Sequence, residues 1–198
     1  MLYIVASWTT MNDLFIIIAL ILLNGVFSMS EVALISARKS KLTTDARNGN
    51  RNADIALKLQ GNPDRFLSTI QIGITLIGIL TGLFSGATIA SEISDYFVKL
   101  GMSPKPALNL SRIIIVTLVT YLSIVVGELV PKRIGMGKAD TIAKIMARPM
   151  RLLSVIAYPI VWVLSASTSL LVRILRIRGN TPAVTEDEIK SLIQEGAD

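Results

Sequence analysis

The chain has 198 residues, of which 52% are hydrophobic, and it carries a formal net charge of +6 and a mean hydropathy of +0.60. Its apolar residues stand in long blocks, which is typical of a membrane protein and not of a soluble domain. It contains no cysteine and no histidine, which excludes disulfides, Cys- or His-ligated zinc and catalysis by either residue. The basic residues cluster between the apolar blocks, which favours contact with anionic lipid over nucleic acid, because few aromatics are placed to stack on bases.

The first apolar block, residues 14–37, is long enough to span a membrane as a helix. A signal peptide is the competing interpretation, and it is disfavoured because no Lys or Arg precedes the block, which is also too long. Asn24, Ser28 and Glu31 follow one another at i, i+4 and i+7, so they share one face of this helix.

Residues 38–65 form a polar segment with seven basic and three acidic residues. Asn48–Asn50 is typical of a turn, and residues 53–60 are expected to form a short surface helix.

The second span is expected over residues 66–90. Polar side chains lie near its start, and three glycines four residues apart follow, which predicts a seam where helices pack closely. The polar residues are Ser68, Gln71 and Thr75, and the glycines are Gly78, Gly82 and Gly86. Residues 91–112 are expected to connect to the third span, with a loop at 103–106.

The third span, residues 113–131, ends at a carboxylate followed by a proline, Glu128 and Pro131. A charge inside a bilayer is costly, by about 2.5–3.5 kcal/mol on insertion scales. Pro131 has no N–H to give the carbonyl of Gly127, so a helix that continues through it leaves that oxygen free beside the carboxylate. The pair is a candidate set of hard oxygen ligands.

A fourth apolar run, 152–172, has basic residues at both ends, and these residues favour the cytoplasmic side. Counting the crossings puts the amino end outside and residues 131–151 inside, so 138–175 is predicted to be a helical hairpin at the cytoplasmic face. Residues 179–198 resemble a linker and the capped start of a further helix, Thr185 to Glu188, at the edge of a cytosolic domain.

At about 1.5 Å per helical residue, this topology brings oxygen-bearing side chains of three helices to a similar depth. No Lys or Arg shares that depth, so the sequence predicts an acidic cavity, open to the cytoplasm, that attracts an external cation. Its candidate lining, beyond Asn24, Ser28, Gly127 and Glu128, is Glu31, Ser68, Gln71, Thr75, Ser123 and Pro131.

Structural roles compete with this interpretation. A hydroxyl such as that of Ser123 can bond back to its own helix, and Asn24 or Gln71 can link helices. Glu31 can pair with Arg38, and Glu128 with Lys132, although Pro131 is expected to distort the second pair. Oxygen ligands without nitrogen or sulfur suit Mg²⁺, Ca²⁺ or Na⁺, and an organic cation such as a polyamine also suits an acidic cavity.

Several motifs, in order along nearly the whole chain, resemble the transmembrane domain of the CorC/cyclin M (CNNM) family. They are Asn24–Ser28 with Glu31–Leu34, Asn62–Leu67, Ser68–Gly73, Gly127–Lys132 and Thr185–Ile189. The resemblance implies a homodimer of three spanning helices with juxtamembrane helices, followed by a cytosolic pair of ATP-binding CBS modules. It also implies Mg²⁺ export, coupled to Na⁺ entry.

Carried over by position, the family's Mg²⁺ site falls on Asn24, Ser28, the carbonyl of Gly127 and Glu128. The second helix departs from the family's pattern, because Ile74 and Gly78 stand where magnesium-handling members tend to have asparagine. A branch with this Ile/Gly pattern is linked to polyamine export, so the cation stays open between Mg²⁺ and a polyamine such as putrescine or cadaverine.

The sequence therefore predicts an all-α, multi-pass transporter domain of the cell membrane over residues 1–178, with its amino end outside and its carboxyl end cytoplasmic. An ion sensor that does not transport is an alternative from another class. An enzyme is not expected, because the spans contain neither Asp nor His for intramembrane hydrolysis.

Overall fold

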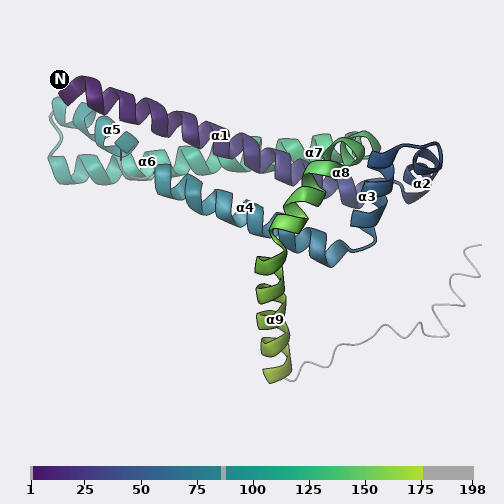
Figure 1. Ribbon diagram of the computed structural model, residues 1–198. Helices are drawn as coiled ribbons and strands as arrows, with labels where there is room; N and C mark the ends of the chain where they lie inside the picture. The colour runs from purple at the N-terminus through teal and green to yellow at the C-terminus, as the bar shows by residue number, and fades with distance from the viewer. Residues whose placement is uncertain (1, 86–87, 176–198) are drawn as a thin grey trace, which may run out of the picture. The chain divides into compact units, whose positions relative to one another are not determined.

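The computed structural model describes residues 2–85 and 88–175, and these residues form helices without a single strand (Figure 1). This confirms the all-α prediction. The helices are α1 (Leu2–Ser36), α2 (Lys39–Arg47), α3 (Arg51–Gln60), α4 (Pro63–Ser85), α5 (Thr88–Lys99), α6 (Pro104–Ile124), the π-helix η1 (Val125–Leu129), α7 (Val130–Gly137), α8 (Ala139–Ile156) and α9 (Tyr158–Ile174). The chain divides into two compact units, residues 1–158 and 159–198, and the described part of the second is the remainder of α9.

Three helical stretches of the described residues are long and apolar enough to cross a membrane, which agrees with the predicted number of spans. They are Met11–Ser36, Pro63–Lys99 and Pro104–Gly137. Helices α8 and α9 add a fourth only if the pair counts as one broken span, so the location of the hairpin at the membrane face stays a prediction. The predicted linker and capped helix over 179–198 lie outside the described residues.

Residues 91–112 connect the second and third spans as expected, but the loop predicted at 103–106 is wrong, because a helix begins inside it. Helix α5 continues to Lys99, and α6 begins at Pro104, inside the expected loop. Proline is well tolerated in the first turn of a helix, where its missing N–H would have no helical partner. Pro104 and Pro106 therefore mark the start of a long helix.

Helices α2, α3 and α8 pack around the carboxyl end of α1. Helix α3 confirms the predicted surface helix, and the side chain of Asn50 caps it by accepting from the N–H groups of Asn52 and Ala53. Helix α2 was not predicted. The cluster's buried side chains come from α1, α2, α3, α4 and α8, among them Leu34, Leu42, Ala56, Phe66 and Ala147.

Helix α1 approaches η1 and α7 closely along a line of small residues, which we call the glycine seam: Gly25, Gly127 and Gly135. A Cβ built on Gly135 would lie 2.7 Å from the backbone oxygen of Met29, and one on Gly25 would lie 2.9 Å from Cγ of Pro131. A Cβ on Gly127 would lie 3.1 Å from the carbonyl oxygen of Ile21. A side chain at any of these positions would push the two backbones apart.

No heavy atom of the described residues lies within 4 Å of a Cβ at Gly78 or Gly82, so the close-packing seam predicted on α4 is not formed within one chain and stays a prediction. Gly86 lies outside the residues that the structure describes.

An ion pair outside the spans joins the end of α1 to the start of α8. Asp140 accepts from the backbone N–H of Arg38 at 2.9 Å and from its Nη2 at 2.7 Å, and Nζ of Lys41 lies 3.3 Å away. The hydrogen bonds from the Arg38 side chain and backbone lower the pKa of Asp140 from 3.8 to about 2. Arg38 therefore pairs with Asp140 and not with Glu31, which was the other partner considered.

We predict that Asp140→Asn lowers the melting temperature of the detergent-solubilised domain at pH 7. A carboxylate with a depressed pKa contributes its full stability above its unfolded pKa, near 4, and loses it as the pH falls towards about 2. The melting temperature of the wild type should thus drop more steeply than that of the variant below pH 4.

The control is Asp54→Asn, which breaks an exposed pair with Lys58 within α3. Such pairs contribute little to stability. Equal melting curves for Asp140→Asn and Asp54→Asn would contradict the role of the Arg38–Asp140 pair.

Candidate functional site

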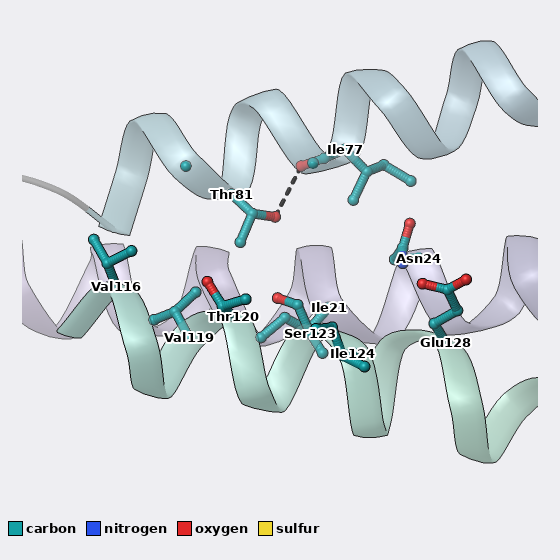
Figure 2. A pocket seen from close by; sticks show the side chains of 12 residues that line it. Ile21, Asn24, Ile77, Thr81, Val116, Val119, Thr120, Ser123, Ile124 and Glu128 are labelled. Atoms are coloured by element: carbon teal, nitrogen blue, oxygen red, sulfur yellow. Dashed lines mark hydrogen bonds between the residues drawn. The ribbon is translucent and has the colours of Figure 1, made fainter. Parts of the chain in front are cut away.

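A cavity of about 320 Å³ lies between α1, α4, α6 and η1 (Figure 2). Most of its wall is apolar, and its polar groups come from all four elements. Its lining residues are Ile21 and Asn24 of α1, Ile77, Gly78, Thr81 and Gly82 of α4, Val116, Val119, Thr120, Ser123 and Ile124 of α6, and Glu128 of η1.

The polar groups of the cavity are unevenly distributed. Figure 2 shows Asn24 and Glu128 at one end and Val116 at the opposite end, with the hydroxyl groups between them. Thr81 donates to the carbonyl of Ile77 at 2.8 Å, the back-bonding that makes many membrane hydroxyls merely structural. The cavity is therefore a largely apolar channel with one acidic end.

The two glycines of α4 account for part of the open volume. Gly78 and Gly82 both line the cavity, and the space in which their side chains would stand is empty of protein atoms within 4 Å. The sequence identified Gly78 as a missing ligand, and the structure shows that it also leaves room.

The acidic end is built on a π-helical turn. The N–H of Val130 donates to the carbonyl of Val125, five residues back, so the helix continues past Pro131 with one residue more than an α-turn holds. Pro131 has no N–H to offer, and the carbonyl of Gly127 instead accepts from Nδ2 of Asn24 at 2.9 Å. The helix therefore continues through Pro131, as the prediction required, but the carbonyl of Gly127 is not free, because the amide of Asn24 donates to it.

Two buried oxygens on the same face of α1 have no hydrogen-bond partner within the described residues. They are Oδ1 of Asn24 and Oγ of Ser28, and Ser28 is only 1% exposed. A buried oxygen without a donor costs free energy, roughly 1–3 kcal/mol, unless a ligand or water completes it. Of the two residues, Asn24 lines the cavity, so its Oδ1 is available to a cation there.

Glu128 has a cationic partner, the residue that the sequence named as its alternative partner. Nζ of Lys132 lies 2.6 Å from Oε1 of Glu128, one helical turn away. The proline between them was expected to distort this pair, yet the pair forms on a helix that continues through Pro131 after the π-helical turn. The cavity therefore contains a carboxylate whose charge is balanced in the absence of ligand.

Of the remaining candidate residues, only one lies in the cavity wall. Ser123 lines it, whereas Pro131 packs against Gly25 in the glycine seam. Glu31, Ser68, Gln71 and Thr75 do not line it, and the last two are exposed. Thr81 and Thr120 do line it and were missed, although their spacing from Gly78 and Ser123 would have placed them on the same faces.

Among the described residues, no three acidic side chains gather into a metal-binding cluster, and Glu128 is the one acid in the cavity wall. A cation bound here would be held by the carboxylate of Glu128 together with neutral oxygens of Asn24 and the Gly127 carbonyl, whereas Ser28 is buried and does not line the cavity. Oxygen-only ligation of this kind suits hard cations and ammonium groups more than transition metals.

Residues 15–198 match the model of a family described as the cyclin M transmembrane N-terminal domain. The chain belongs to this family. Its membership agrees with the resemblance carried by the Asn24, Ser68 and Gly127 motifs, and it makes the chain a multi-pass membrane domain of a transport family.

Relatives of this cyclin M domain include UPF0053 protein sll0260 of Synechocystis, 45% identical over 93% of this chain. The polyamine export protein of Escherichia coli K12 is 33% identical over 94% of the chain, and UPF0053 protein YhdP of Bacillus subtilis is 31% identical over 92%. In each case the match covers 42% of the relative, so this chain spans less than half of their length.

We predict that Lys132→Met tightens cation binding in the cyclin M domain, because a ligand no longer has to displace the ammonium group from Glu128. A partly exposed ion pair contributes about 0.2–1 kcal/mol, so the affinity should rise by at most about fivefold. Isothermal titration calorimetry with Mg²⁺ measures the change. The matched control is Arg133→Met, which removes an exposed neighbouring charge. If both variants gain affinity equally, the Lys132–Glu128 pair is not a competitor.

Proposed function

We propose that this cyclin M domain exports Mg²⁺, with Na⁺ as counter-ion, through the cavity that ends at Glu128. It acts as a homodimer in the cell membrane, and the full-length protein carries a cytosolic CBS pair that binds ATP. The observation that supports the proposal most strongly is the group of oxygens at the acidic end. Among the described residues, Asn24 Oδ1 is unpartnered beside Glu128 in the cavity wall, and the amide of Asn24 donates to the Gly127 carbonyl. Ser28 Oγ, one turn further along α1, is a buried oxygen outside the cavity wall, and it too is unpartnered in the described part of the chain.

Binding requires two local exchanges at this end. Nδ2 of Asn24 donates to the carbonyl of Gly127, and a half-turn of the amide would direct Oδ1 towards a cation beside that carbonyl. The ammonium group of Lys132 leaves Glu128 at the same time. Both exchanges move only a side chain, the amide of Asn24 and the ammonium group of Lys132, so we expect the cation to bind without a rearrangement of the packed helices.

Polyamine export is the second candidate, and the shape of the cavity favours it. A diamine has ammonium ends separated by methylene groups, which match one acidic end and a long apolar wall. The open space beside Gly78 and Gly82 widens this wall. The similarity to a polyamine export protein supports the same interpretation.

We predict that Glu128→Gln weakens Mg²⁺ binding to the purified domain, because the one acidic ligand of the cavity is lost. The affinity should fall at least about tenfold, which corresponds to about 1.4 kcal/mol. Calorimetry is the measurement, and Glu31→Gln is the control, since it removes an acid of α1 that does not line the cavity. Unchanged affinity for Mg²⁺ in Glu128→Gln would rule out the site.

Measuring flux into proteoliposomes with the full-length protein separates a transporter from a sensor, because a sensor binds the ion without moving it.

The second prediction separates the two substrates. Gly78→Leu would fill the open space along α4, so it should weaken binding of cadaverine several-fold and leave the Mg²⁺ affinity unchanged, because the oxygen ligands lie at the end of the cavity. Competition between cadaverine and Mg²⁺ in the titration measures both. Gly137→Leu, where a Cβ also meets open space but outside the cavity, is the control. A wild type that binds no cadaverine would leave Mg²⁺ export as the function.

A further inference from the structure

A second pocket, of about 230 Å³, lies within the first unit between α3, α4 and α8. It belongs neither to the cavity at Glu128 nor to the glycine seam. We call it the arginine pocket, and its lining residues are Ile55, Lys58, Leu59, Asn62, Arg65, Phe66, Arg151, Ser154 and Val155.

The arginine pocket carries two positive charges that no carboxylate balances. Lys58 is paired with Asp54 at 2.7 Å. Arg65 and Arg151 make no ion pair with any acid in the described residues. The guanidinium of Arg65 lies 4.4 Å from the ring centroid of Tyr158, a cation–π contact that orients it and leaves its N–H edge available to an anion.

A buried hydroxyl lines the same pocket. Ser154 is 7% exposed, and its Oγ has no hydrogen-bond partner among the described residues. A hydroxyl enclosed to this degree normally finds a partner, because an unmade hydrogen bond costs free energy. Two guanidinium groups and an unpartnered hydroxyl are the donors that a phosphate group requires.

The place of the two arginines in the chain indicates where that phosphate comes from. Arg65 directly precedes the apolar run of α4, and Arg151 directly precedes the apolar run that begins at Leu152. Basic residues at the ends of apolar runs lie at the level of the lipid headgroups. Beside the charges, Leu152 and Val155 are 62% and 60% exposed and offer an apolar surface at the same point of α8.

We propose that the arginine pocket binds the phosphate group of an anionic glycerophospholipid. Arg65 and Arg151 contact the phosphate oxygens, Ser154 donates to one of them, and the acyl chains lie along Leu152 and Val155. A free phosphate ion shares the headgroup's charge but lacks the chains, so it would leave this apolar surface uncovered. The lipid would link α3, α4 and α8 at one level of the membrane.

Native mass spectrometry of the purified chain tests the proposal by counting phosphatidylglycerol and phosphatidylcholine molecules retained from mixed micelles. The wild type should retain phosphatidylglycerol in preference. The double variant Arg65→Gln/Arg151→Gln should lose this preference at least fivefold. The matched control is Arg47→Gln/Arg148→Gln, which removes two exposed arginines that do not line the pocket and should retain lipid like the wild type.

Ser154→Ala removes only the unpartnered hydroxyl, so it should fold normally and lower retention about two- to fivefold, since one hydrogen bond to a charged group is lost. If the double arginine variant fails to fold, Ser154→Ala still tests whether the arginine pocket binds the lipid. Equal losses in both double variants, or full retention in Ser154→Ala, would overturn the proposal. Displacement of the lipid by millimolar inorganic phosphate would also overturn it and assign the pocket to a free anion.

Discussion

The close approach of α1 to the η1–α7 segment is the constraint on which the rest of the domain depends. Three positions without side chains, Gly25, Gly127 and Gly135, let two helix backbones meet. This contact brings the amide of Asn24 within 2.9 Å of a carbonyl that Pro131 cannot satisfy. In a membrane no water is available to pair with a free carbonyl, so an unpaired Gly127 oxygen would cost free energy. The close packing of the two helices is therefore needed for the hydrogen bond that satisfies this oxygen.

The same contact places the candidate ligands. The cavity's acidic end lies directly beside the glycine seam, so Asn24 and the Gly127 carbonyl are held where two helix backbones meet. Val116 stands at the opposite end of the cavity, and the open positions at Gly78 and Gly82 belong to the wall that α4 contributes (Figure 2). A rigid end that recognises charge and a roomier apolar wall are suited to different parts of a substrate. Mg²⁺ would use the first alone, and a diamine would use both.

Much of the architecture was predictable from the sequence, because long apolar runs and their basic flanks constrain a membrane chain strongly. Glu128, Pro131 and the freed carbonyl were found by asking which groups the bilayer makes expensive. The pair with Lys132 was named but disfavoured, because Pro131 was expected to distort the helix, whereas the helix continues through it after the π-helical turn. The sequence pointed to close packing on α4 and not at the glycine seam, because spacing shows which residues are small but not which of them meet a neighbouring backbone within the chain. Gly25, Gly127 and Gly135 give no regular repeat within one helix of the sequence.

The π-helical turn has a consequence for chain length. In an uninterrupted α-helix, residues 120, 124, 127, 131 and 135 would follow one another along a single face, since neighbours three and four apart align. The extra residue in Val125–Leu129 shifts the residues after it by one position, about 100°, from that register, so Glu128 can face the cavity while Gly127 and Gly135 face α1. A deletion of one residue between 125 and 129 would return the segment to a regular α-helix and leave the orientations of α6 and α7 unchanged. The extra residue therefore shapes the turn at Gly127 and Glu128 locally, and the packing of α7 against α1 does not depend on it.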